Sequence, residues 1–446
     1  MSVCAGFAKT DITPRVGVEL AGFGPFCCRK SIAVRDKLWA RAMAVRKDDD
    51  HFIIVSCDLI GLGVAQTRKI RKIVCDNLEV DEKSIMVHCT HTHSGPSIKS
   101  YSGWGEYDMP YLETLPYHIA KACIEAWKNL TCATIEHAEV PCEGIGLNRE
   151  YDIDAPPLAE ILDENWRPAK PELTDTTCHV IKVKDSNDKM IGFASYFGCH
   201  PVVCCAETRY IHGDYVGVAT NMLERENQCV GLFIQGAQGD VNSCCVHKSE
   251  NDSLLALDVI AARYARAVRN GLNKAKVIVI DKVAYCNDEI SFTRQNYDIE
   301  KIEKLLADYE SKVHNFDATD ADRSLRMNCV YIAALRKFLK KKEHNQNLSE
   351  PTEIQAVRFG PVTITASGFE TFQNLKNRVV KARPAPITLV AGLTNDAMGY
   401  AVDKTKAGQG GYAADIVPFI TGQIPYAKIY EELPEALIAA AIRLNG

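Results

Sequence analysis

The stretch "SIMVHCTHTHSGP" (residues 84–96) joins a short apolar run to a pair of histidines and then to a sharp turn. Alternate residues of a β-strand face the same side of a sheet. The apolar positions that alternate from Ile85 share one parity with His91 and His93, so we expect these two side chains to lie next to each other where a buried strand ends. His88 is expected to point to the opposite face. The Ser-Gly-Pro triplet that closes the stretch breaks the strand.

Apolar runs of strand length recur along the chain, and helical periodicity lies between several of them. The runs cover residues 51–63, 84–93, 179–184, 190–201, 229–240, 276–286, 353–368 and 386–396. The clearest helical patterns cover residues 66–78, 117–130 and 254–272. This alternation predicts an α/β fold: a mixed, largely buried β-sheet flanked by helices, with the active site at the strand ends.

Residues 297–343 have a different pattern. An apolar stripe from Ile299 to Tyr309 predicts one amphipathic helix, and a second helix is expected from about Ser324. We expect this helical pair to lie on the sheet domain as an elaboration. No repeat, low-complexity tract or long flexible linker divides the chain, so residues 1–446 are predicted to form a single domain.

The composition excludes several classes of partner. The 446 residues are 46% hydrophobic and 24% charged, and their formal net charge is −5. This charge gives no attraction to nucleic acid or to an anionic membrane, so neither partner is predicted. No apolar run reaches transmembrane length and the first residues lack the features of a secretory signal, which predicts a cytoplasmic protein without stable membrane association. The composition does not decide whether the protein forms a homo-oligomer.

Cysteine usage supports the same location. The 18 cysteines include three adjacent pairs, but their spacing contains no CxxC motif of the kind that binds zinc or carries redox chemistry. Adjacent cysteines rarely bond to each other. We therefore expect free, mostly buried thiols in a reducing compartment.

Two histidines at positions i and i+2 of a strand end suit a metal ion, because their imidazole nitrogens converge on one point. The same pattern also occurs in protein cores and turns, where both rings form ordinary hydrogen bonds. Two further strand ends favour the metal: His200 ends the apolar run 190–201, and Glu370 follows the run that ends at residue 368. Three strand ends that carry metal-binding side chains are expected to meet in one site.

Other residues near predicted strand ends suit a site of this kind. The glycines of "GAQGD" (236–240) allow backbone amides to approach a ligand closely. Arg149 could hold an anionic or carbonyl oxygen, and the flexible turn "GQGGY" delivers Tyr412. Asp58 and Asp214, both beside glycine-containing turns, could orient the ligating histidines. A surface ion pair, a plain loop and helix-capping residues are the ordinary alternatives for these features.

A set of motifs resembles one known family. The motifs "GFAKTDITP", "THTHSGP", "GLNR", "CHP", "HGDYVG", "GAQGDVN", "GFETF" and "NDAMGY…GGY" occur in the order and rough spacing of the neutral/alkaline ceramidases. The resemblance extends from Ala5 to about Asp415. Members of that family are zinc amidases that cut the N-acyl bond of sphingoid bases, so the resemblance implies a Zn²⁺-dependent hydrolase that acts on carbon–nitrogen bonds.

The resemblance also implies roles for individual residues. The positions that match the family's zinc ligands are His91, His200, Glu370 and Tyr400. The positions that match its residues near the substrate carbonyl are His93, Arg149 and Tyr412. Tyr412 lies twelve residues after Tyr400, which is the family's spacing.

The chain also departs from the family pattern. Asn242 stands where the family carries a serine, so attack by a serine is not expected unless Ser243 replaces it. His212 stands where the family has a small residue, and together with Cys204 and Cys205 it suggests a smaller, more polar pocket. The family's exported members continue into an immunoglobulin-like domain, whereas this chain ends at Gly446 and has no signal. These differences predict a small, soluble acylated substrate in place of ceramide.

The resulting hypothesis is a cytoplasmic zinc hydrolase that cleaves an amide or related acyl bond with metal-activated water. One alternative is a metal-dependent amidohydrolase barrel acting on a cyclic amide or ester. That fold places its HxH motif on the first strand, whereas a strand and a helix are predicted before His91 here. The other alternative is a non-catalytic ligand-binding protein on the same scaffold.

Overall fold

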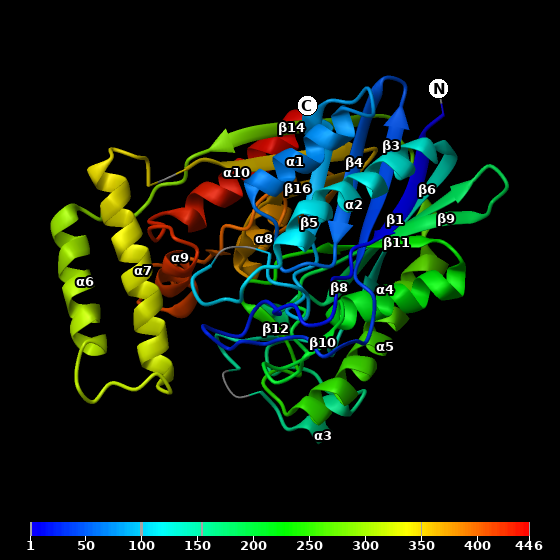
Figure 1. The fold of residues 1–446 in the computed structure, drawn as a ribbon. Coiled ribbons are helices and arrows are strands. Elements are labelled where there is room, and N and C mark those ends of the chain that lie inside the picture. The colour runs from blue at the N-terminus through cyan, green and yellow to red at the C-terminus, as the bar shows by residue number, and fades with distance from the viewer. Residues whose placement is uncertain (1, 99–100, 153–154, 349, 446) are drawn as a thin grey trace.

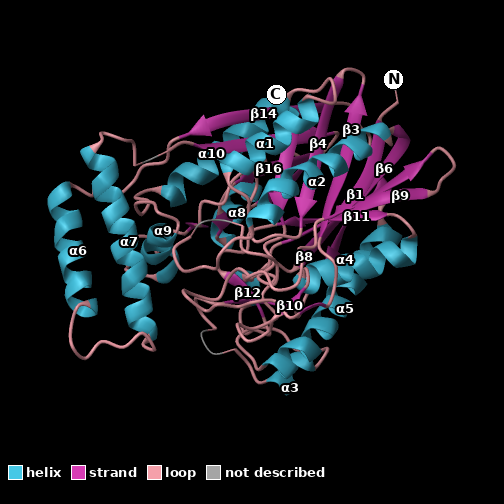
Figure 2. Ribbon diagram, in the orientation of Figure 1, coloured by secondary structure: helices cyan, strands magenta, loops and turns pink. Residues whose placement is uncertain are grey.

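The structure is a computed structural model, and it describes residues 2–98, 101–152, 155–348 and 350–445. Its largest element is a nine-stranded mixed sheet (Figures 1 and 2). The strands follow the spatial order β11 (Val230–Gln235), β9 (Met190–Phe197), β8 (Thr177–Asp185), β6 (Thr131–Pro141), β1 (Cys4–Asp11), β3 (Trp39–Lys47), β4 (Asp50–Cys57) and β5 (Ile85–Cys89), with β13 (Lys276–Val277) paired to β6. The pairs β4–β5 and β9–β11 are parallel, and the other pairs are antiparallel.

A second sheet packs on the first. Its four strands are β14 (Val283–Ile290), β15 (Thr352–Phe359), β16 (Val362–Ser367) and β18 (Ile387–Ala391), in that order. The two sheets share one apolar core, in which the rings of Phe52 and Phe359 lie 5.6 Å apart. The predicted α/β class with a mixed, buried sheet is therefore confirmed, but the strands form two main sheets in place of the single sheet expected. Two open stacked sheets also exclude the barrel of the amidohydrolase alternative.

Helices cover the outer face of each sheet. α1 (Val64–Cys75) and α2 (Met109–Lys128) pack on one half of the large sheet, and α4 (Asp214–Asn227) and α5 (Glu250–Lys274) pack on the other half. α8 (Gln373–Lys381) and α10 (Ile429–Asn445) cover the small sheet. The result is a four-layer arrangement of helices, sheet, sheet and helices (Figure 2). No helix in the described part of the chain has the length and apolarity needed to cross a bilayer.

Strands from different parts of the sheets are joined where their carboxyl ends meet. β1 and β6 pair through only two residues each, so the large sheet consists of two halves. The halves meet again at β11, because the Gln235 N–H donates to His88 Nε2 at 2.8 Å. The small sheet joins the same point, since Gly392 N donates to Gln235 O (3.1 Å) and Cys89 N donates to Leu393 O (3.1 Å). The loops that follow β5, β11 and β18 are thereby held together.

Several short elements complete the fold. They are β2 (Ala33–Val34), β7 (Gly146–Asn148), β10 (Tyr210–Ile211), β12 (Val241–Ser243), β17 (Glu370–Thr371), β19 (Tyr400–Ala401), the 3-10 helices η1 (Glu82–Ser84) and η2 (Pro171–Leu173), α3 (Leu158–Leu162), the π-helical turn η3 (Tyr412–Ile416) and α9 (Val417–Ile420). Three of the pairs, β2–β10, β7–β12 and β17–β19, are two-stranded ladders outside both main sheets. They fix loop segments that would otherwise have no backbone partners.

The helical pair is present, but it does not lie on a sheet. α6 (Ile299–Val313) begins after Asp298, whose side chain accepts from the N–H of Lys301, and α7 (Arg323–Glu343) begins after Asp322. The apolar faces of the two helices pack on each other and on α9, where the ring of Phe419 contacts Phe338 (centroids 5.9 Å apart). The pair therefore projects to one side of the sheets (Figure 1). The single-domain organisation stays a prediction.

Candidate active site

His91 follows the end of β5 by two residues and is fixed by the loop after β4. Its Nδ1 lies 2.6 Å from Ile60 O, and its backbone N–H donates to Leu59 O at 2.9 Å. Because only a protonated nitrogen can donate to a carbonyl, Nε2 of the neutral ring carries the lone pair. His91 has φ +74°, so the chain leaves the strand direction here. The expected strand to His93 is therefore wrong: β5 ends at Cys89, while His88 does point to the opposite face, as expected.

His200 follows β9 and has the same arrangement. Its Nδ1 lies 2.6 Å from Gln238 O, and its Nε2 lies 2.9 Å from Oε2 of Glu370. The side chain is buried, and this burial lowers the pKa of His200 to about 4 although the neighbouring carboxylate raises it. The neutral ring thus also turns its Nε2 lone pair toward the centre of the site.

Glu370 lies between the two imidazoles. It belongs to β17, and its Oε2 is 3.2 Å from His91 Nε2 as well as 2.9 Å from His200 Nε2. Burial on its own would raise the pKa of Glu370, but the two imidazoles hold that pKa well below its usual range. Two lone pairs and a carboxylate oxygen at these distances repel one another unless a proton or a cation lies between them. The donor set of nitrogen and oxygen atoms is of the kind that binds zinc.

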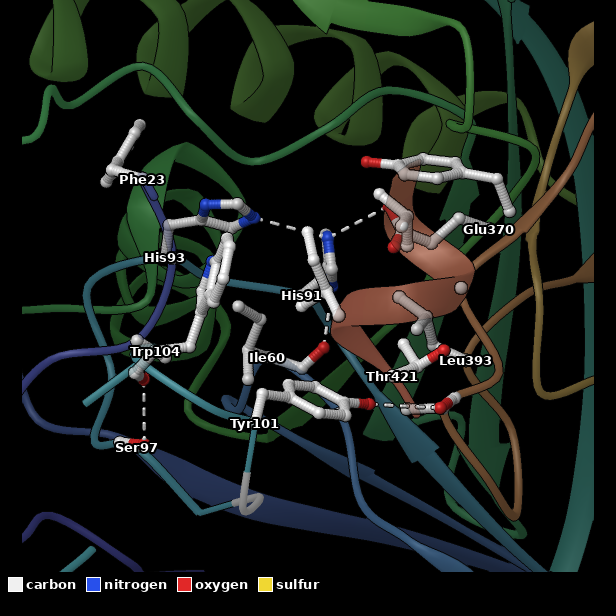
Figure 3. A pocket seen from close by; sticks show the side chains of 18 of the residues that line it. Phe23, Ile60, His91, His93, Ser97, Tyr101, Trp104, Glu370, Leu393 and Thr421 are labelled. Carbon is white, nitrogen blue, oxygen red and sulfur yellow. Dashed lines mark hydrogen bonds and ion pairs between the residues drawn. The ribbon is translucent and has the colours of Figure 1, made fainter. Parts of the chain in front are cut away.

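His93 completes the cluster on the side opposite Glu370 (Figure 3). Its Nε2 is 3.2 Å from His91 Nε2, and the nitrogens of His91, His93 and His200 all lie within 4.8 Å of one another. Burial lowers the pKa of His93, as do the charges of His91 and His200, whereas Glu370 opposes this shift. Its Nδ1 is buried and has no hydrogen-bond partner among the described residues. His93 is therefore the least constrained of the three rings.

Another wall of the site is formed by Tyr400, Arg149 and Tyr412. Tyr400 is the β19 partner of Glu370, and its ring lies 6.1 Å from the ring of Tyr412. The guanidinium of Arg149 lies 4.9 Å from the centre of the Tyr400 ring and donates through Nη2 to Gly239 O at 2.5 Å. Burial raises the pKa of Tyr400 well above its usual value, although Arg149 opposes this shift. All seven residues singled out from the sequence thus lie in one region.

Asp240, whose role the sequence left open, ties two parts of this wall together. Its Oδ1 accepts from the N–H of Gln373 at 2.8 Å, and its Oδ2 accepts from Nδ2 of Asn148 at 3.0 Å. Burial raises the pKa of Asp240 to about 6 despite these donors. Through the two contacts, Asp240 links the segment that carries Arg149 to the segment after Glu370.

Of the two roles left open for Asp58 and Asp214, the structure does not support orientation of the ligating histidines. Asp58 is bonded to Arg41 (2.7 Å) and to the N–H of Trp39 (3.0 Å), and Asp214 accepts from backbone N–H groups, including that of Tyr215 at 2.8 Å. Neither carboxylate is hydrogen-bonded to a histidine of the site. The carbonyl oxygens of Ile60 and Gln238 orient the rings in their place.

Two cavities open on the cluster from different sides. The smaller has a volume of about 110 Å³ and mostly apolar walls, which include Ile98, Leu393 and Ile420. The larger has a volume of about 1170 Å³ and reaches the α7 amino end. Five residues line both cavities: Phe23, His93, Trp104, Tyr400 and Tyr412. If the scissile bond of a substrate lay beside these five residues, the group on one side of the bond would occupy the small apolar cavity and the group on the other side the large cavity.

The expected pocket walls differ from those observed. His212, Cys204 and Cys205 are buried and line neither cavity, so they do not make the pocket smaller or more polar. Ser243 is also fully buried, and its Oγ accepts from the N–H of Cys245, whereas Asn242 does line the large cavity. Ser243 therefore has no access to a substrate.

Sequence reasoning missed several residues of the site. Gly22 and Phe23 lie against His93, and Trp104 lines the same cavity, but nothing in the local pattern of Trp104 distinguishes it from a loop residue. The glycines of "AGFGPF" (residues 21–26) could have indicated that this loop lies close to the site, because glycine allows the backbone to approach other groups closely.

Comparisons with known proteins agree with this geometry. Residues 4–250 match the family model described as neutral/alkaline non-lysosomal ceramidase, N-terminal. The crystal structure of the neutral ceramidase from Pseudomonas aeruginosa has 16% sequence identity and a TM-score of 0.75, and the match covers 100% of this chain and 74% of that one. A structure described as ceramidase complexed with C2 has 14% identity and the same TM-score, over 100% of this chain and 75% of that one. At these identities the two structures show a shared fold, and the family match covers more than half of the chain. The protein therefore belongs to the neutral/alkaline non-lysosomal ceramidase family of amide hydrolases.

Proposed function

We propose that this protein is a zinc-dependent amidase that uses water to cleave a small N-acyl compound. The observation that supports it best is the convergence of the His91 and His200 Nε2 atoms on Oε2 of Glu370. The Nδ1–H of each ring donates a hydrogen bond to a backbone carbonyl. The converging Nε2 atoms are therefore acceptors that need a cation. Such an arrangement is costly in a protein that binds no ion.

The expected ligands are His91, His200, Glu370 and Tyr400. When bound there, Zn²⁺ supplies a water of lowered pKa (about 7) and polarises the scissile carbonyl. The three nearer residues fit this role directly. Tyr400 lies on the paired strand β19, next to Glu370, and would complete the set.

His93 is proposed to move the proton. It lines both cavities, so its ring faces the bond that joins the two parts of the substrate. From there it would accept a proton from the attacking water and deliver one to the leaving nitrogen. The lack of any partner at its buried Nδ1 among the described residues leaves the ring free to make these contacts.

Arg149 and Tyr412 are proposed to bind the oxyanion that forms during attack. Arg149 is anchored by Gly239 O and faces the large cavity, and Tyr412 lines both cavities. Donors that are already in position stabilise developing charge without reorganisation. Water is the nucleophile in this scheme, and neither Asn242 nor Ser243 is needed for the attack.

The size of the small cavity favours a short acyl group. A cavity of roughly 150 Å³ holds one benzene molecule, and the cavity here is about 110 Å³. A long fatty chain exceeds this space, whereas an acyl group of a few carbons fits. The 18 free cysteines favour a reducing compartment, in line with the predicted cytoplasmic location.

The test is a comparison of substrates with purified zinc-loaded protein. We expect turnover of short N-acyl amines and N-acyl amino acids, and little turnover of long-chain ceramide in mixed micelles. Release of the free amine measures the reaction for both groups. Efficient cleavage of ceramide without turnover of the soluble compounds would show that the protein is a ceramidase of the ordinary lipid-cleaving kind.

A further inference from the structure

The large cavity carries basic side chains that have no acidic partner. Arg149, Lys248 and Arg323 line it, and no ion pair joins any of them to a carboxylate in the described part of the chain. Among the described residues Lys248 donates only to the carbonyl of Ala155, at 3.3 Å, and Arg149 donates to Gly239 O. Unpaired cations around a cavity next to an active site attract anionic ligands.

Among the described residues, two acidic side chains line the same cavity, against three cations. Asp322 is the residue before α7, and both of its carboxylate oxygens accept hydrogen bonds from Ser324. That leaves Asp152 as the one carboxylate of the cavity that has no hydrogen bond among the described residues. The pKa of His247, also in the cavity wall, is lowered by partial burial and then by the charges of Arg323 and Arg149. The described charged side chains that line the cavity therefore sum to one positive charge, three cations against two carboxylates.

Arg323 belongs to the helical pair that projects beside the sheets. It is the first residue of α7, it is exposed, and its guanidinium makes no hydrogen bond or ion pair with any described residue. Met327, one turn further along α7, and Ile416 lie in the same wall, together with Val202 and Val246 from the opposite side. The cavity thus combines a free guanidinium with apolar surface.

We propose that the substrate is an N-acyl amino acid with an apolar side chain, and that Arg323 and Lys248 bind its carboxylate. This inference rests on the proposed function and adds the chemistry of the leaving group. The short acyl group occupies the small cavity, and the amino-acid part occupies the large one. A guanidinium can hold a carboxylate through two parallel hydrogen bonds, which suits it to this role.

The reaction balances with water as the only co-reactant. The oxygen of water forms a bond to the acyl carbon, the C–N bond breaks, and the leaving nitrogen keeps the bonding electron pair. The two protons of water end on the leaving nitrogen at neutral pH. The products are a short carboxylate and a zwitterionic amino acid.

The experiment uses a matched pair of substrates, N-butanoyl-L-phenylalanine and its C-terminal amide. The two differ only in the terminal group, which is a charged carboxylate in one and an uncharged carboxamide of similar size in the other. We expect the wild type to prefer the acid, and we expect Arg323→Ala to reduce the acid-to-amide ratio of kcat/KM about tenfold or more, mainly through KM. Arg336→Ala is the control, because Arg336 is on the same helix, is bonded to Glu310 and does not line the cavity. It changes the net charge equally and should leave the ratio unchanged.

Two results would overturn the inference, and they differ in what they say about the proposed function. If the wild type cleaves the amide as well as the acid, or if Arg323→Ala and Arg336→Ala change the ratio equally, then carboxylate recognition is wrong while amide hydrolysis stands. If neither compound nor any simple N-acyl amine is cleaved by the zinc-loaded protein, then the proposed function itself fails.

Discussion

Within the described part of the chain, the ring of His93 has one hydrogen-bond contact, between its Nε2 and His91 Nε2 at 3.2 Å, and is otherwise held by packing. Its Nδ1 has no partner among the described residues, whereas the ring of Phe23 lies edge-on to it at 5.1 Å. The backbone of Gly22 also packs on the ring, because a Cβ added to Gly22 would lie 2.3 Å from His93 Nδ1 and 2.7 Å from His93 Cγ. The backbone carbonyl of His93 accepts from Nη1 of Arg29 at 3.1 Å. The geometry of the proposed proton transfer therefore depends on the absence of a side chain at Gly22.

Gly22→Ala should lower kcat by about 100-fold, because displacing a catalytic ring by about 1 Å costs that much. Gly22 also has φ +87°, so any larger residue adds backbone strain. Gly17→Ala is the matched control, since Gly17 has φ +99° but the nearest atom to a Cβ added to it would be Nη1 of Arg15, at 4.0 Å. Steady-state kinetics with circular dichroism measures both effects. Equal losses in the two variants would mean that strain, and not contact with His93, explains the result.

At the scale of single residues, the sequence predicts which side chains form the site better than it predicts the backbone groups that orient them. The residues His91, His93, His200 and Glu370 can be identified from the sequence and do meet. However, the HxH pair comes together through a left-handed turn at His91 and not through strand alternation. The groups that orient the rings are the carbonyls of Ile60 and Gln238. Every residue type has a carbonyl, so no residue type marks these positions.

Among the elements, α7 and α9 connect the projecting helical pair to the site. α9 contributes Val417 and Ile420 to the wall of the small cavity, and its Phe419 packs on the other side against the pair. α7 supplies Arg323 and Met327 to the large cavity. A change in how the pair docks would therefore alter both cavities.

Phe338→Ala should destabilise the protein by about 3–5 kcal/mol, because the ring is buried at the centre of this docking contact. It is 1% exposed and packs against Phe419. Phe316→Ala is the control on the loop between α6 and α7, where the ring is fully exposed, and it should change stability by less than about 0.5 kcal/mol. Urea denaturation gives both values. Similar stabilities for the two variants would contradict this docking contact.

Elements with strong local patterns can be predicted, and those with weak patterns cannot. The amphipathic stripe of α6 and the apolar runs of β4, β9 and β18 give clear signals. β1, "CAGFAKTD", has small and polar residues, and its Gly6 packs so closely against α2 that a Cβ would lie 2.2 Å from Ala126 O. Tertiary contact, and not local preference, makes that segment a strand.

For the whole molecule, the sequence predicts the fold class but not the number of sheets. Strands that are buried on both faces are apolar throughout, so their pattern does not say which neighbours they pair with. Phe52 and Phe359 face each other although 307 positions separate them in the chain. The two cavities depend in turn on loops brought together by this packing. Their volumes, and the position of Arg323 in one of them, could not be predicted before the sheets were placed.

The central claim is that His91, His200 and Glu370 hold a metal ion beside a separate proton-transfer residue, His93. The most direct test is the zinc content of wild type, His91→Ala and His93→Ala, measured by elemental analysis together with kcat. We expect about one zinc per chain in the wild type and almost none in His91→Ala. In His93→Ala we expect the zinc to remain while kcat falls roughly 10²–10⁴-fold. Equal zinc in wild type and His91→Ala, or full activity of a zinc-free wild type, would contradict the account.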